Sequence, residues 1–168
     1  MQPGDFFLTH GSGFIPALID FGEWLQRAGP DRWATHAGLL DHFDETRNDW
    51  ATIEATGSGV EQCWLSSHGE ANVNYRVVNS GLDERGRTLA VAQGRDWLGV
   101  AYGFVTFASI AVDILTPSPL MVRSKRTLIC SELVARALYH GGWDCPALDF
   151  GRVTPADLAK WFRVESLS

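Results

Sequence analysis

The chain lacks the cysteine content of a disulfide-stabilised protein. Its 168 residues include three cysteines, Cys63, Cys130 and Cys145, and no two of them form a C-x-x-C pair. An odd number of widely spaced thiols excludes a fully paired disulfide scaffold, and three are too few for a cysteine zinc knuckle. Each cysteine must therefore be explained by packing or by thiol chemistry.

Motifs for metal and serine chemistry are also missing. No H-E-x-x-H segment or comparable ligand spacing is present, so we expect no metal ion and no other cofactor. A metal-dependent hydrolase using His10, His36, Glu54 or Cys130 is a weak alternative. Ser12 lies in "HGSG", which lacks the G-x-S-x-G pattern of a serine nucleophile.

Positive charge is scarce, and lysine occurs only at positions 125 and 160. The formal net charge is -6 and the isoelectric point about 5.3. A nucleic-acid-binding face needs clustered basic residues, so we expect no nucleic-acid partner.

Long hydrophobic runs are absent as well. The longest apolar region, residues 100–115, contains polar side chains and is too short to cross a bilayer. The start, "MQPGDFFLTHGSG", does not resemble a signal peptide. We therefore expect a cytoplasmic protein without an integral membrane segment. Action outside the cytoplasm would require delivery by a phage or a secretion system.

What is present predicts one α+β domain over residues 1–168. Hydrophobic residues make up 45% of the chain, which is enough for a real core. Period-two patterns predict strands in the first half, and amphipathic patterns predict helices before, between and after them. The strands are expected at 4–10, 33–41, 50–59, 60–72 (a short strand and loop) and 74–79, and the helices at 14–29, 82–99, 130–141 and 153–162. Residues 103–115 suit a buried helix or strand, and 42–49 and 116–126 suit loops.

Cys130 is the candidate nucleophile. In "RTLICSELVARALYHGG" the apolar residues after it recur at helical spacing, and Gly141 is a natural helix stop. Cys130 and Ser131 therefore lie at a helix start. Unpaired N–H groups and the helix dipole favour a thiolate there.

His36 is the candidate base, and Glu54 is the group expected to orient it. His140 is ten residues of helix from Cys130 and too distant to act on it. A hairpin centred near Glu45 would place Glu54 directly opposite His36. Gly38, on the same face, would leave room for a substrate or for the cysteine helix.

Each of these residues also has a purely structural interpretation. A cysteine at a helix start can be inert packing, a strand histidine can be a satisfied core residue, and a strand glutamate can face solvent. The functional interpretation is stronger for the three together, because one hairpin joins Glu54 to His36 and one helix offers an activated thiol.

The order of motifs resembles the circularly permuted branch of the NlpC family of papain-like cysteine peptidases and amidases. The similar segments run from about Gly4 to Trp161 and are "GDFFLT", "THAGLL", "IEATGSGV", "YRVV", "LGVAYGF", "ICSELV" and "VTPADLAKW". The resemblance implies a mostly antiparallel sheet with the nucleophile helix packed on one face.

The resemblance also implies a Cys130–His36–Glu54 triad, with Tyr102 lining the site. We assign Tyr102, Gly38 and Ser131 to substrate binding. The expected reaction is hydrolysis of an amide, ester or thioester in a small-molecule, peptide or acyl substrate.

Two alternatives stay open. The lecithin retinol acyltransferase group shares the permuted order and transfers acyl chains, although it usually has asparagine where Ile129 precedes Cys130. A binding module that has lost catalysis is the other, and the intact triad argues against it. The sequence indicates no oligomeric state.

Overall fold

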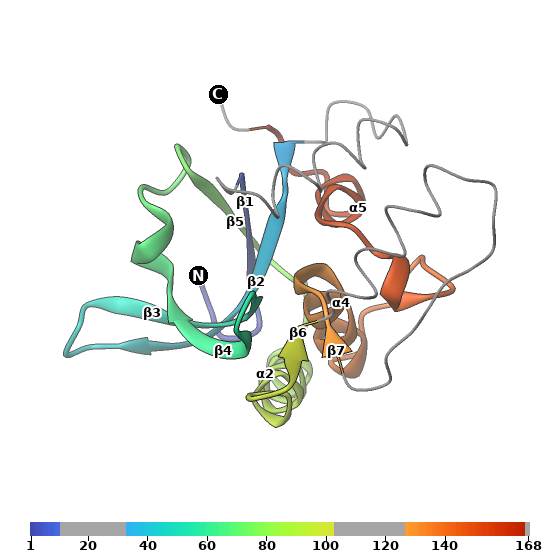
Figure 1. The fold of residues 1–168 in the computed structure, drawn as a ribbon, viewed down its shortest axis with the longest axis horizontal. Helices are drawn as coiled ribbons and strands as arrows, with labels where there is room; N and C mark the ends of the chain where they lie inside the picture. Colours follow the sequence, from blue (N-terminus) through green and yellow to red (C-terminus); the bar gives the residue numbers. More distant parts are fainter. Residues whose placement is uncertain (11–32, 103–126, 167–168) are drawn as a thin grey trace.

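A five-stranded antiparallel sheet forms the centre of the structure, a computed structural model that describes residues 1–10, 33–102 and 127–166 (Figure 1). The strand order is β4-β3-β2-β1-β5, and every neighbouring pair is antiparallel. The strands are β1 (Phe6–Thr9), β2 (His36–Asp44), β3 (Asp49–Thr56), β4 (Gly59–Trp64) and β5 (Tyr75–Val78).

Three α-helices accompany the sheet in the described part of the chain: α2 (Glu84–Asp96), α4 (Cys130–His140) and α5 (Pro155–Trp161). Two 3-10 turns, η2 (Leu65–His68) and η3 (Phe150–Arg152), and a parallel pair, β6 (Ala101–Tyr102) with β7 (Thr127–Leu128), complete it. The expected α+β class is confirmed. The helix expected at 14–29, the apolar segment 103–115 and the loop 116–126 lie outside the described residues.

The helices pack on one face of the sheet, as Figure 1 shows for α2, α4 and α5. That face carries the alternate residues Phe6, Leu8, Ala37, Leu39 and Ile53, which form one core with the apolar stripe of α4. The opposite face carries a smaller cluster of Phe7, Leu40, Leu65 and Tyr75. Period-two alternation thus divides the sheet between two apolar layers.

Two glycines inside α2 allow the helix to approach its neighbours closely. A Cβ at Gly86 would lie 2.3 Å from the carbonyl oxygen of Gly141, at the end of α4. A Cβ at Gly94 would lie 2.9 Å from Leu39 of the sheet. The packing explains why glycine is retained there despite its low helix propensity.

The β2–β3 hairpin differs in register from the expected one. Gly38, and not His36, is paired with Glu54. Strand β2 continues through the expected turn to Asp44, and an irregularity between Leu40 and His42 shifts the pairing. The offset of two residues preserves the side-chain face, so His36 is a diagonal neighbour of Glu54 on the same face.

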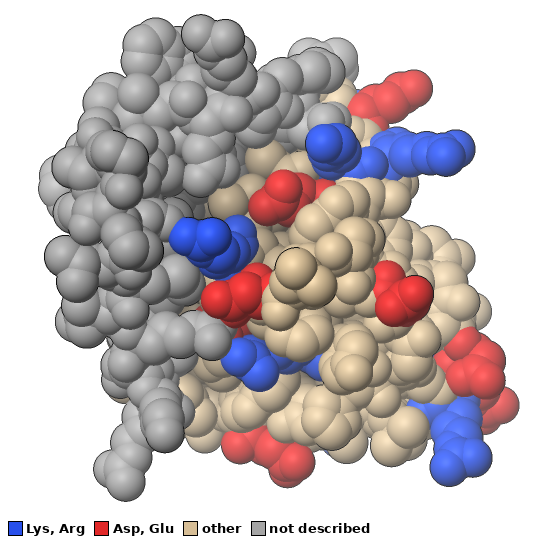
Figure 2. All heavy atoms as spheres, turned by 90° about the vertical axis from the view of Figure 1, so that its right-hand side faces the viewer, with Lys and Arg blue, Asp and Glu red and all other residues tan. Residues whose placement is uncertain are grey.

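One face of the molecule carries charges of both signs. On the face in Figure 2, the basic and acidic side chains of the described residues are interspersed. Among the described residues, no helix is long and apolar enough to span a membrane.

Candidate active site

Cys130 is the first residue of α4, as expected. Ile129 at the N-cap provides no side-chain cap to the helix start. Two backbone N–H groups donate to the Cys130 sulfur, one from Ser131 at the helix start and one from Ala37 on β2. The side chain is 3% exposed, while α4 buries Leu133, Val134, Ala137 and Leu138 beneath it.

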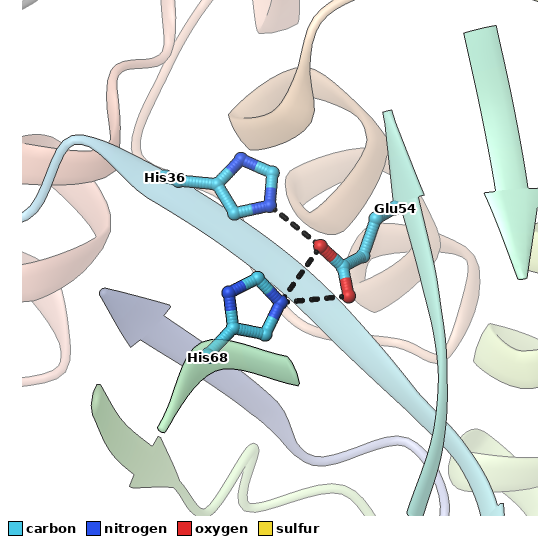
Figure 3. Close-up of side chains that lie close together, drawn as sticks. All are labelled: His36, Glu54 and His68. Carbon is cyan, nitrogen blue, oxygen red and sulfur yellow. Dashed lines mark hydrogen bonds and ion pairs between the residues drawn. The ribbon is translucent and has the colours of Figure 1, made fainter. Parts of the chain in front are cut away.

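His36 joins the thiol to a carboxylate. Its Nε2 lies 2.7 Å from Oε2 of Glu54, and its ring is also hydrogen-bonded to the Cys130 side chain (Figure 3 shows the histidine and the glutamate). Since Nε2 is bonded to Glu54, Nδ1 is the nitrogen left for the thiol. The three residues come from β2, β3 and the start of α4, and form one hydrogen-bonded chain.

The electrostatics of the Cys130–His36 pair favour the charged forms. Burial by itself would lower the pKa of His36, but hydrogen bonds and charge interactions with Cys130 and Glu54 raise it to about 10. Burial by itself would raise the pKa of Cys130, but the hydrogen bond and charge of His36, with the two backbone N–H donors, lower it. The arrangement therefore supports a thiolate–imidazolium pair at neutral pH.

Glu54 is a buried carboxylate with three side-chain donors. It is 1% exposed and accepts hydrogen bonds from His36, His68 and the hydroxyl of Thr52. Burial opposes its charge, yet the hydrogen bonds from His36 and His68 lower its pKa to about 2. An ionised carboxylate can only accept, so both imidazoles present N–H groups to it.

His68 is the site residue that sequence reasoning missed. Its Nε2 lies 3.1 Å from each oxygen of Glu54, and its ring stacks on that of His36 with centroids 5.7 Å apart. The expected short strand and loop end in the turn η2, which places His68 over the sheet. Its position in a polar loop gave no periodic signal for this contact.

The placement of α4 corrects one expectation. We expected the cysteine helix on the sheet face that carries His36, Gly38 and Glu54, but α4 packs on the opposite face. Cys130 reaches His36 at the beginning of β2, where its sulfur accepts the Ala37 N–H. The triad therefore spans both faces at one end of a strand.

The residues assigned to substrate binding are placed differently from one another. The space beside Gly38 is filled, because an added Cβ would lie 2.4 Å from the Phe7 ring and 2.8 Å from Glu54, so no room is left there for a substrate or for α4. The hydroxyl of Ser131 is buried and donates to the carbonyl of Val153, so only its backbone N–H serves the site. Tyr102 pairs through its backbone with Leu128, two residues before Cys130.

The remaining cysteines have a different environment. All three cysteines are unpaired, and Cys63 and Cys145 are half-buried. Burial and the charges of Glu54 and Glu61 raise the pKa of Cys63 to about 12. Burial and nearby aspartates raise the pKa of Cys145, against one backbone hydrogen bond that lowers it. Cys130 is the thiol whose surroundings stabilise the anion.

Comparison with known proteins gives a fold relative but no family. No protein-family model and no curated protein matches the chain. Among solved structures, the chain is similar to one described as metalloprotein yiiX (DUF1105) of Escherichia coli O157:H7. The TM-score is 0.58 at 17% identity, and the match covers 99% of this chain and 86% of the other. This likeness extends over the whole fold and carries no residue roles.

Proposed function

We propose that the protein is a cysteine hydrolase that cleaves an amide, ester or thioester through Cys130, His36 and Glu54. One observation carries the proposal: the ring of His36 is hydrogen-bonded both to a buried carboxylate and to a thiol at an uncapped helix start. A nucleophile, its base and an oriented third group are the parts that covalent acyl transfer requires.

The geometry suggests the following sequence of steps. The Cys130 thiolate attacks the substrate carbonyl carbon, and backbone N–H groups at the start of α4 stabilise the oxyanion. The imidazolium of His36 gives its Nδ1 proton to the leaving group as the bond breaks, which leaves a thioester on Cys130. His36 then takes a proton from water, whose oxygen attacks the thioester. The C–S bond breaks, which releases the carboxylic acid and restores the Cys130 thiolate beside the His36 imidazolium.

The motif order supports assignment to the permuted papain-like hydrolases. The antiparallel sheet with α4 on one face fits that proposal, as does the sequence order of His36 before Cys130. An acyltransferase would use the same first step and replace water by another acceptor. A metal-dependent hydrolase at His36 and Glu54 would give no role to the Cys130 thiol that is hydrogen-bonded to His36. We therefore rank this alternative below the cysteine hydrolase.

Alkylation of Cys130 should depend less steeply on pH than alkylation of the other two cysteines. Because the hydrogen bond and charge of His36 lower the pKa of Cys130, its iodoacetamide rate should approach a plateau at lower pH than that of an ordinary thiol. Cys63 and Cys145, whose pKa values are raised, should react about tenfold faster with each added pH unit. Peptide mapping of protein alkylated in the presence of EDTA measures all three rates.

The matched control is His36→Ala, which should return the Cys130 rate to a steep pH dependence. If Cys130 in the folded wild type already shows that steep dependence, or stays unmodified while Cys63 reacts, the activated-thiol proposal is wrong.

His68→Ala should lower hydrolysis of an activated ester such as p-nitrophenyl acetate by about tenfold, because Glu54 would lose one of its anchoring donors. The acid limb of the pH–rate profile should also shift to higher pH. Loss of the His68 hydrogen bond removes one interaction that lowers the pKa of Glu54. His42→Ala is the control, because His42 pairs with Asp41 away from the triad. Equal rates and profiles for His68→Ala and wild type would contradict this role.

A further inference from the structure

The contact of His68 with Glu54 creates a second arrangement at the same place. His36, His68 and Glu54 each offer one ligand atom, and these atoms all lie within 4.8 Å of one another, with both Nε2 atoms directed at the Glu54 carboxylate. They come from β2, η2 and β3, and Figure 3 shows both rings turned toward the carboxylate. The two imidazoles remain partly exposed, at 19% and 20%, so an ion from solvent has a path to them.

The donor set defines the class of ion. Two imidazole nitrogens and one carboxylate suit Zn²⁺ and similar divalent transition metals, whereas Mg²⁺ and Ca²⁺ prefer oxygen ligands. Zinc bonds of about 2.0–2.2 Å place tetrahedral ligands about 3.3 Å apart. The nitrogen–oxygen separations of 2.7 and 3.1 Å are close to that value, and the two ring nitrogens lie within 4.8 Å of each other, so the side chains would have to adjust but not to change place to admit an ion.

An ion at this position would compete with the Cys130–His36–Glu54 hydrogen-bonded chain for His36 and Glu54. It needs the Nε2 lone pair of His36, so the Nε2 proton leaves to solvent, and so does the Nε2 proton of His68. The remaining proton of His36 is then on Nδ1, which faces Cys130. In that state His36 is a neutral, ion-bound imidazole, so Nδ1 could give its proton to the leaving group only by forming an imidazolate, which is a far weaker acid–base couple than the imidazolium, and Glu54 is held by the ion.

We propose that His36, Glu54 and His68 form an inhibitory site for a divalent transition-metal ion such as Zn²⁺. The inhibitory part rests on the proposed hydrolase function, whereas the site itself does not. Cys130 is not a ligand. This distinguishes the site from direct capture of zinc by the Cys130 thiolate, which would need no His68.

Zinc binding by EDTA-stripped protein tests the site without reference to activity. In equilibrium dialysis, wild type and Cys130→Ala should each bind one Zn²⁺ per chain, and His68→Ala should bind at least about a hundredfold more weakly. His42→Ala, which removes a histidine from another histidine–carboxylate pair, should bind like wild type. Absence of stoichiometric zinc in wild type, loss of zinc in Cys130→Ala, or retention in His68→Ala would overturn the site.

Ester hydrolysis then tests inhibition. Zinc should inhibit wild-type hydrolysis of p-nitrophenyl acetate with its midpoint at the binding midpoint, and His68→Ala should need at least about a hundredfold more zinc. Zinc-dependent hydrolysis by Cys130→Ala would make the ion catalytic and overturn the inhibitory role. A wild type without thiol-dependent hydrolysis would refute the proposed function, while the dialysis result would still decide the metal site.

Discussion

Cys130→Ala is expected to abolish formation of an acyl-enzyme and to lower p-nitrophenyl acetate turnover by at least about 10³-fold. The reason is that the thiol is the group proposed to form the covalent intermediate. His36→Ala should cause a loss of similar size, because the thiol then lacks both its proton acceptor and its charge partner. The burst of p-nitrophenolate and the steady-state rate measure the two effects.

The double variant separates a catalytic pair from two independent residues. Since Cys130 and His36 act on one proton, Cys130→Ala with His36→Ala should be little slower than either single variant. Cys145→Ser is the control, because Cys145 lies beyond α4 and its replacement should leave the burst intact. If the Cys130→Ala variant has wild-type circular dichroism and still shows the p-nitrophenolate burst, Cys130 is not the nucleophile.

Glu54→Gln should cost about 3 kcal/mol of unfolding free energy at pH 7, because the folded-state pKa of Glu54 is about 2 against an ordinary value of 4.5. A depressed carboxyl pKa stabilises the fold above the ordinary value, and this contribution is lost as pH falls toward 2. About a quarter of it should be gone by pH 4 and more than half by pH 3. Urea unfolding followed by tryptophan fluorescence at pH 7, 5, 4 and 3 measures the difference.

The control for this experiment is Glu61→Gln on β4. Glu61 is paired with Glu54 across the strands but is partly exposed. Its replacement should cost less than about 1 kcal/mol at pH 7, as expected of a partly exposed carboxylate. A Glu54→Gln protein as stable as wild type at pH 7, or a difference that does not shrink on acidification, would contradict the buried ion pair.

Local patterns predicted the elements that hold the site. The start of α4 at Cys130 is confirmed because apolar spacing and a glycine stop determine a helix largely within its own residues. The helix expected at 153–162 is likewise confirmed as α5, and Thr154 and Asp157 form a capping box at its start. The prediction that His36 and Glu54 share a face is confirmed although the predicted register was wrong. A shift of two residues leaves a side chain on the same face of the sheet.

The errors concern information that no local pattern contains. The irregularity between Leu40 and His42 shifts the register, with the buried Asp41 bonded to Arg95 of α2. The face of the sheet that α4 covers depends on how the apolar side chains are distributed between the two faces. The alternation along each strand therefore could not predict it. His68 reaches Glu54 through an irregular turn, and a contact of that kind follows only from the tertiary fold.

The meeting of α4 with the start of β2 has a consequence for biosynthesis. His36 and Glu54 belong to one hairpin, which is local in sequence, but Cys130 is almost a hundred residues later. A chain synthesised from its N-terminus therefore completes the hairpin well before the thiol exists, and the long-range contact that activates the thiol forms last. If His36 activates Cys130 as proposed, the thiol should have nearly ordinary acidity until α4 docks, and chains that have not folded should lack the activated nucleophile. The recovery of fast Cys130 alkylation during refolding should thus report the docking of α4 on the start of β2.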